Sequence, residues 1–167
     1  MSVATTGGKK IHGRKRHLLV DTQGLLIRVK VLAANITDRD GAAILLTSLV
    51  GHLPRLQLIW ADSGYQGKFE AWVDQLLGGV QLEIVTHPWT GIKGTWAPIG
   101  TKVDWDTIIP KGFHLLPKRW VIERTNAWIT RHRRLSRDFE GTHTSSEAFI
   151  YLAMTRIMVA RLARASP

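Results

Sequence analysis

The spacing of hydrophobic and polar residues in the first third of the chain predicts a hairpin followed by a helix. Two β-rich runs, 17–21 and 25–31, are separated by the short glycine-containing connection 22–24, which is typical of a hairpin turn. A polar segment with several capping side chains follows, and apolar residues then recur at helical spacing over 42–53. Pro54 is expected to end that helix.

The middle of the chain predicts a strand, a helix and a second strand. The short apolar run 56–61 is bounded by turn residues and is consistent with a buried strand. Helical spacing over 68–77 is closed by Gly78 and Gly79, and a further strand is expected over 81–86.

The last part of the chain predicts two long helices after a segment without a clear period. Residues 89–112 contain glycines, prolines and three tryptophans, which suggests a long loop or an insertion. Pro117 suits the first turn of a helix that runs to about residue 137. The pattern Thr-Ser-Ser-Glu over 144–147 is a capping box that opens a final helix, to about residue 163.

These elements indicate one α/β domain over residues 1–167, with a mixed sheet covered by helices. Hydrophobic residues make up 44% and charged residues 22% of the chain, as in ordinary soluble proteins. No apolar run approaches the length of about 18 residues that spans a bilayer, and the first ten residues lack an apolar signal core. We therefore expect a cytoplasmic bacterial protein without a membrane partner.

The net charge of the chain indicates the kind of partner that it binds. The formal net charge is +10, which predicts attraction to a polyanion and makes nucleic acid the first candidate. The alternative is that the basic residues are solvated faces or belong to a protein that binds ribosomal RNA. Two blocks carry much of the charge: Lys9, Lys10, Arg14, Lys15 and Arg16, and then Lys118, Arg119, Arg124, Arg131, Arg133, Arg134 and Arg137.

Two carboxylates are the candidates for chemistry. Asp62 follows the predicted strand 56–61, at the carboxyl end where α/β sheets collect functional groups, although a turn or capping role is the commoner meaning of such a residue. Glu123 lies among arginines on the helix that follows Pro117, where a surface ion pair is the ordinary interpretation. Because the chain has no cysteine, any metal must be held by oxygen or imidazole ligands, and carboxylates favour Mg²⁺ or Mn²⁺.

Histidine ligands offer a different hypothesis, a metal-dependent hydrolase. The histidines are scattered and lack the close spacing of a zinc site, and phosphate or structural hydrogen-bonding roles fit His114 and His132 better. These scattered histidines are His12, His17, His87, His114, His132 and His143.

Four segments, in the same order, resemble the catalytic region of insertion-sequence transposases of the IS5 family. They are Gly-Arg-Lys-Arg-His-Leu-Leu-Val-Asp-Thr-Gln-Gly-Leu (13–25), Asp-Arg-Asp-Gly-Ala (38–42), Trp-Ala-Asp-Ser-Gly-Tyr-Gln-Gly (60–67) and Arg-Trp-Val-Ile-Glu-Arg-Thr-Asn-Ala-Trp (119–128). The chain departs from the family pattern at Ser63, Leu116 and Thr130.

The resemblance implies an RNase H-like fold and a DDE triad, in which two aspartates and a glutamate bind two Mg²⁺ or Mn²⁺ ions for DNA strand cleavage and transfer. Asp62 then matches the second aspartate and Glu123 the glutamate. Arg119 matches an arginine that contacts DNA or steadies the glutamate. The cations expected to bind DNA, at the insertion-sequence ends and the target, are Lys15, Arg16, Lys118, Arg119, Arg124, Arg131 and Arg134.

The first aspartate of the triad and its central strand have no counterpart in this chain. Asp21 fits a hairpin turn, and Asp38 and Asp40 fit helix capping, so none of them is expected to replace it. We therefore expect an RNase H-like sheet whose first central strand is missing, with two of three carboxylates. The chain is then a truncated product, or half of a frameshifted enzyme whose upstream-frame product supplies the aspartate, and a homo-oligomer when active. The alternative is an inactive basic DNA-binding fragment that interferes with intact transposase.

Overall fold

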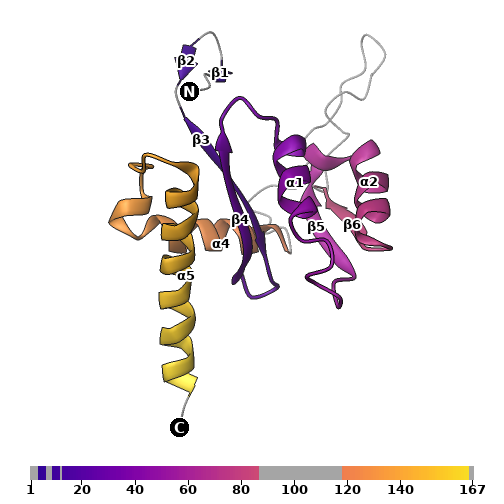
Figure 1. Cartoon of the computed structure of the whole chain (residues 1–167). Coiled ribbons are helices and arrows are strands. Elements are labelled where there is room, and N and C mark those ends of the chain that lie inside the picture. Colours follow the sequence, from indigo (N-terminus) through magenta and orange to yellow (C-terminus); the bar gives the residue numbers. More distant parts are fainter. Residues whose placement is uncertain (1–3, 7–8, 12, 87–117, 166–167) are drawn as a thin grey trace, which may run out of the picture.

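The computed structural model describes residues 4–6, 9–11, 13–86 and 118–165, which form three small sheets and several helices (Figure 1). Strands pair as β1 with β2, β3 with β4 and β5 with β6. In chain order the elements are β1 (Ala4–Thr6), β2 (Lys9–Ile11), β3 (Arg14–Val20), β4 (Leu26–Ala33), α1 (Asp38–Thr47), β5 (Leu58–Asp62), η1 (Ser63–Tyr65), α2 (Lys68–Leu77), β6 (Gln81–Val85), α4 (Arg119–Thr130), η2 (Arg133–Leu135) and α5 (His143–Ala165).

The antiparallel hairpin β3–β4 stands between α1 on one side and α4 and α5 on the other (Figure 1). Its turn forms because the Asp21 carboxylate accepts hydrogen bonds from the backbone N–H groups of Gln23 and Leu25, both at 2.8 Å. Gly24 adopts a positive φ of 79° in the same turn, a conformation that favours glycine. The predicted hairpin and the turn role of Asp21 are therefore confirmed.

The first hydrophobic core lies between the hairpin and the C-terminal helices. Val29 and Val31 of β4 pack with Ile129, Ile150 and Met154, all at most 2% exposed. Polar side chains of α5 also close the outer edge of β4. The backbone N–H groups of the two valines donate to the Tyr151 hydroxyl at 3.2 Å and to the Glu147 carboxylate at 2.9 Å.

The second core lies under α1 and α2. Leu45 and Leu46 of α1 pack with Ile59 of β5 and with Phe69 and Val73 of α2. The strands β5 and β6 run parallel, joined by α2, which is the strand, helix, strand succession that the sequence predicts.

Helix α2 has the predicted bounds, whereas α1 and α4 end earlier than predicted. Helix α1 stops at Thr47 with Ser48 as its C-cap, before Pro54 is reached. Helix α4 stops at Thr130, and a separate short turn, η2, follows instead of a continuous helix to residue 137. The strands β1 and β2 are not predicted by the sequence pattern. Segment 89–112 lies outside the described residues, as do His12, His87, His114, Leu116 and Pro117.

Helix α5 confirms the predicted final helix but not its capping box. The Thr142 hydroxyl, not that of Thr144, accepts the backbone N–H of Ser145 at 3.1 Å. Glu147, the expected reciprocal partner, reaches instead to Val31 of β4. The prediction of a capping box over 144–147 is therefore wrong, because the Glu147 carboxylate binds the backbone of β4 and not the start of its own helix.

The mixed α/β class is confirmed, but the strands of the described residues do not join into one sheet. The β3–β4 hairpin and the β5–β6 pair remain separate two-stranded sheets. None of the helices in the described part of the chain is both long and apolar enough to cross a membrane.

Candidate active site

Asp62 is the last residue of β5 and begins the loop that leads to α2. Its carboxylate accepts the backbone N–H of Gly64 at 2.9 Å, which caps the short helix η1 and fixes the side chain. Arg39 of α1 holds the same loop by donating to the carbonyls of Gly64 at 2.8 Å and Gln66 at 3.1 Å. The predicted place of Asp62, at the carboxyl end of a strand, is confirmed, whereas its catalytic role stays a prediction.

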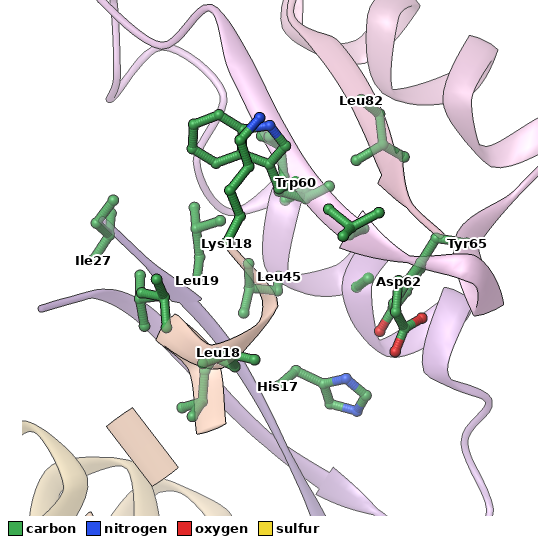
Figure 2. Close-up of a pocket in the computed structure, with 18 of the residues that line it drawn as sticks. His17, Leu18, Leu19, Ile27, Leu45, Trp60, Asp62, Tyr65, Leu82 and Lys118 are labelled. Carbon is green, nitrogen blue, oxygen red and sulfur yellow. The ribbon is translucent and has the colours of Figure 1, made fainter. Parts of the chain in front are cut away.

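A cavity of about 870 Å³ separates β3 from β5. Apolar side chains line most of it, and Figure 2 shows Leu18, Leu19, Leu45, Trp60 and Leu82 around it. One end is polar, where Asp62, Tyr65 and His17 lie together (Figure 2). Nothing in the sequence pattern predicts this cavity, because it depends on how the two sheets pack.

His17 is buried at the polar end of the cavity, with 8% of the residue exposed. Its imidazole lies directly against Gly41 of α1, where a Cβ atom would overlap the ring. Burial lowers the pKa of His17; the Asp38 charge partly opposes this and Lys15 adds to it. No hydrogen-bond partner for Nε2 occurs in the described part of the chain, which is unusual for a buried polar atom.

Tyr65 closes the same end of the cavity. Its ring packs against Phe69, with 5.5 Å between centroids. Burial raises the pKa of Tyr65 to about 12, and the charges of Asp38 and Asp62 add to the effect. The hydroxyl therefore stays protonated at neutral pH and can act as a hydrogen-bond donor. The signals of it in the sequence are its position three residues after Asp62 and its place in the segment 60–67.

Glu123 lies on the exposed surface of α4 and does not line the cavity. Its helix neighbours Trp120, Val121, Ile122 and Asn126 do. The described residues contain no cluster of three or more carboxylate or histidine side chains able to hold a metal ion. Neither a complete carboxylate triad nor a histidine site is therefore present among them.

Three of the predicted DNA-binding cations line the cavity and have partners within the chain. Lys15 Nζ lies 3.0 Å from the Asp38 carboxylate, and Arg16 donates to a main-chain carbonyl of η2 at 2.9 Å. Lys118 Nζ stacks over the Trp60 ring, 4.2 Å from its centroid. These contacts hold β3 and the start of α4 in place.

Two further cations pair with side chains around α4 and α5. Arg124 stacks against the rings of Trp120 and Trp128, at 4.1 and 4.9 Å from their centroids. Arg134 donates from Nε to the Glu140 carboxylate at 2.7 Å. These contacts fix the orientation of the two side chains but leave the net charge of +10, which already counts the acidic residues.

The last two predicted cations stand at the ends of α4. Arg131 is exposed at its C-cap. Arg119 is the first residue of the helix, and its side chain lies outside what the structure describes. The role of all seven cations toward DNA stays a prediction.

Comparison with known proteins supplies the family. Residues 2–158 match the family described as Transposase DDE domain, whereas no curated protein and no solved structure matches the chain. DDE transposases are phosphoryl-transfer enzymes that act on DNA and generally use divalent metal ions. Because the match covers most of its length, the chain belongs to the DDE transposase domain family.

Proposed function

We propose that this chain is the catalytic region of an insertion-sequence transposase of the IS5 type, in which Asp62 and Glu123 are two of the three carboxylates that hold the metal ions. The observation that carries the proposal is the position of Asp62, within a family match that covers most of the chain. It stands on a capped loop at the end of β5, and α4 borders the cavity that opens beside it.

The chemistry of the donors fits Mg²⁺ or Mn²⁺. These hard cations prefer carboxylate oxygens in octahedral geometry and keep positions open for water and phosphate. Such ions supply activation of an attacking oxygen and stabilisation of the leaving one. We propose that a third carboxylate completes this set; Asp21 is held in the hairpin turn and Asp38 lies in the first turn of α1, so neither is assigned to it.

The remaining residues of the site position these groups. Arg39 fixes the loop behind Asp62 from α1, and the Gly64 N–H orients the carboxylate. Tyr65, protonated at neutral pH, can donate a hydrogen bond beside it. Arg131, exposed on α4, faces solvent where a phosphate backbone could approach.

The arrangement of elements supports an RNase H-like sheet that lacks one strand. The β3–β4 hairpin and the β5–β6 pair have helices on both sides, as the two parts of one mixed sheet would. We assign residues 1–167 to this single domain, in a bacterial cytoplasmic enzyme that works as a homo-oligomer. The upstream-frame product of the same element is the proposed source of the missing carboxylate.

A second candidate is a DNA-binding fragment without catalysis, which interferes with intact transposase. It is favoured by the position of Glu123, which lies on the exposed surface of α4 and does not line the cavity beside Asp62. Both candidates predict affinity for DNA that falls steeply with salt, because the net charge is +10. The two candidates differ in whether substitution of Asp62 or Glu123 changes the nicking of DNA.

The experiment measures nicking of DNA that carries the ends of the element, with Mn²⁺ and with the upstream segment supplied in trans. Asp62→Asn and Glu123→Gln should each abolish nicking while leaving DNA affinity within about twofold, since neither changes a cation. Asp74→Asn, on the exposed surface of α2, is the matched control and should nick like the parent chain.

Two results would decide against the catalytic role. Nicking that survives Asp62→Asn or Glu123→Gln would show that these carboxylates do not hold the metal ions. No nicking by the parent chain, with the upstream segment present and DNA bound, would favour the non-catalytic fragment.

A further inference from the structure

Phe139 projects into solvent from the loop between η2 and α5, and 66% of the residue is exposed. Its two neighbours in the chain are held against the protein. The Asp138 carboxylate accepts a hydrogen bond from the Ser146 hydroxyl at 2.7 Å. The Glu140 side chain is 8% exposed, and its carboxylate accepts Arg134 Nε at 2.7 Å. The aromatic ring therefore points outward between two anchored carboxylates.

The main chain of this loop is fixed as well. Arg14 of β3 donates to the Glu140 carbonyl at 2.8 Å and to the Gly141 carbonyl at 3.0 Å. The Asp138 carboxylate also accepts the Glu140 N–H at 3.1 Å. Phe139 cannot fold back onto the core unless these bonds break, although burial of its ring would be favourable. A ring that is already held in place loses little conformational freedom when it binds a partner.

Phe139 lines an open hollow of about 410 Å³ together with Arg133 and Arg134. The Arg134 guanidinium packs over the Phe149 ring, 4.3 Å from its centroid, while its Nε is taken by Glu140. Its two Nη atoms have no acceptor within the part of the chain that the structure describes. The hollow therefore combines an aromatic ring with unused N–H donors of a guanidinium group.

Further positive charge surrounds this hollow. Arg131 before η2 and Arg137 after it are both exposed, and the two nearby carboxylates are each already paired with an arginine. An anion with a planar, stackable group fits such a surface best. A nucleotide offers both parts, because arginine binds phosphate oxygens in a bidentate manner and nucleobases stack on aromatic rings.

The hollow lies apart from the proposed metal site. The loop that carries Phe139 is on the α5 side of the β3–β4 hairpin, whereas β5, which ends at Asp62, is on the α1 side (Figure 1). A nucleotide bound here is therefore not the one whose phosphodiester bond is cut. It belongs to DNA that runs past the other side of the domain.

We propose that Phe139, Arg133 and Arg134 form a nucleotide-stacking site, in which the ring stacks on a nucleobase of bound DNA and a guanidinium group binds the adjacent phosphate. The base is that of an unpaired nucleotide, or belongs to a duplex step that the ring partly unstacks as an apolar wedge. The inference rests on the proposed function only in taking DNA as the ligand, since it uses neither Asp62 nor Glu123.

The test measures binding of the full chain to fluorescein-labelled DNA by anisotropy, without divalent metal, over a range of salt concentrations. The two probes are a mixed-sequence 20-nucleotide single strand and the corresponding duplex. Phe139→Ala should weaken binding at least about fivefold without changing the salt dependence, because no charge is lost. Phe139→Tyr, which keeps the ring, should stay within about twofold of the parent chain. Arg133→Gln should instead reduce the salt slope by about one.

Leu152→Ala is the matched control, because it removes a side chain of α5 that is 63% exposed and should leave affinity within about twofold. Unchanged urea unfolding of Phe139→Ala checks that the variant is folded. A loss confined to the single strand identifies an unpaired nucleotide, whereas a loss with the duplex as well identifies a wedge.

Three results would overturn the proposal. They are unchanged affinity of Phe139→Ala for both probes, a loss that Phe139→Tyr shares, and a changed oligomeric state of Phe139→Ala, which would assign the ring to a contact between copies of the chain. The readout is binding without metal, so it can fail while the proposed chemistry at Asp62 and Glu123 stands. A parent chain that binds neither probe at low salt would instead overturn both.

Discussion

Arg14 ties β3 to the loop before α5, and we expect removal of its side chain to destabilise the fold strongly. Its guanidinium donates to the carbonyl of Glu140 at 2.8 Å and to that of Gly141 at 3.0 Å. It also lies 3.2 Å from the carboxylate of Asp138 and from the hydroxyl of Ser146, which itself donates to Asp138 at 2.7 Å. The change to test is Arg14→Ala, with Arg14→Lys beside it.

The magnitude follows from the number of hydrogen bonds that the guanidinium can make at once. Nη1 carries two hydrogens, so it serves two of its nearby acceptors well, and Nη2 serves the carbonyl of Gly141. A bond to a charged group contributes about 1.5 to 3 kcal/mol, and a side chain that is 21% exposed lies at the lower end. With three such bonds at about 1.5 kcal/mol each, Arg14→Ala should lower the free energy of unfolding by about 4 to 5 kcal/mol, and Arg14→Lys by about half of that.

The pH dependence of this contact has a definite sign. Burial raises the pKa of Asp138, but hydrogen bonds from Ser146, the Glu140 N–H and Arg14 outweigh it and hold the pKa below its usual 3.8. The carboxylate is therefore favoured in the folded state. Its contribution is complete above the unfolded pKa and is lost as pH falls through the lower folded pKa. Asp138→Asn should reduce this loss of folding stability at low pH.

Urea unfolding followed by tryptophan fluorescence measures the predicted losses, with Arg55→Ala, an exposed arginine between α1 and β5, as the matched control. The control should stay within about 0.5 kcal/mol of the parent chain. An Arg14→Ala variant that also stays within that margin would refute the reasoning, because it would mean that solvent replaces the bonds without loss.

Three further predictions use the same unfolding assay. Gly41→Ala should destabilise by about 1 to 3 kcal/mol, despite a better helix propensity, because its Cβ overlaps His17, and adding His17→Ala should recover part of the loss. Thr125→Val should cost about 1 to 3 kcal/mol, since the buried hydroxyl donates to the Gly24 carbonyl at 2.7 Å, and a loss under about 0.5 kcal/mol would contradict it. Because burial lowers the pKa of His17 below 6.5, the folded state prefers the neutral ring and loses stability as pH falls below that value, and His17→Phe should flatten this slope.

Local signals explain what the sequence could predict of the fold. The C-terminal end of helix α2 is predictable because Gly78, in the left-handed conformation at φ 65°, stops the helix whatever packs around it. Helices α1 and α4 are predicted too long because apolar spacing continues beyond them. Leu49 is 3% exposed in the turn after α1, and Leu135 is 3% exposed in η2 after α4. A buried residue just beyond the end of a helix can therefore extend the apolar spacing in the sequence, although its backbone is no longer helical.

Some features of the candidate site could likewise be predicted from local sequence signals, whereas others could not. The position of Asp62 could be predicted because it depends on one strand and one glycine-containing loop. The meeting of His17, Tyr65 and Asp62 could not, since it depends on the packing of two sheets that are far apart in the sequence. The position of Glu123 in a sequence motif does not predict which way its side chain points. Its helix borders the cavity, but Glu123 is not among the residues that line it.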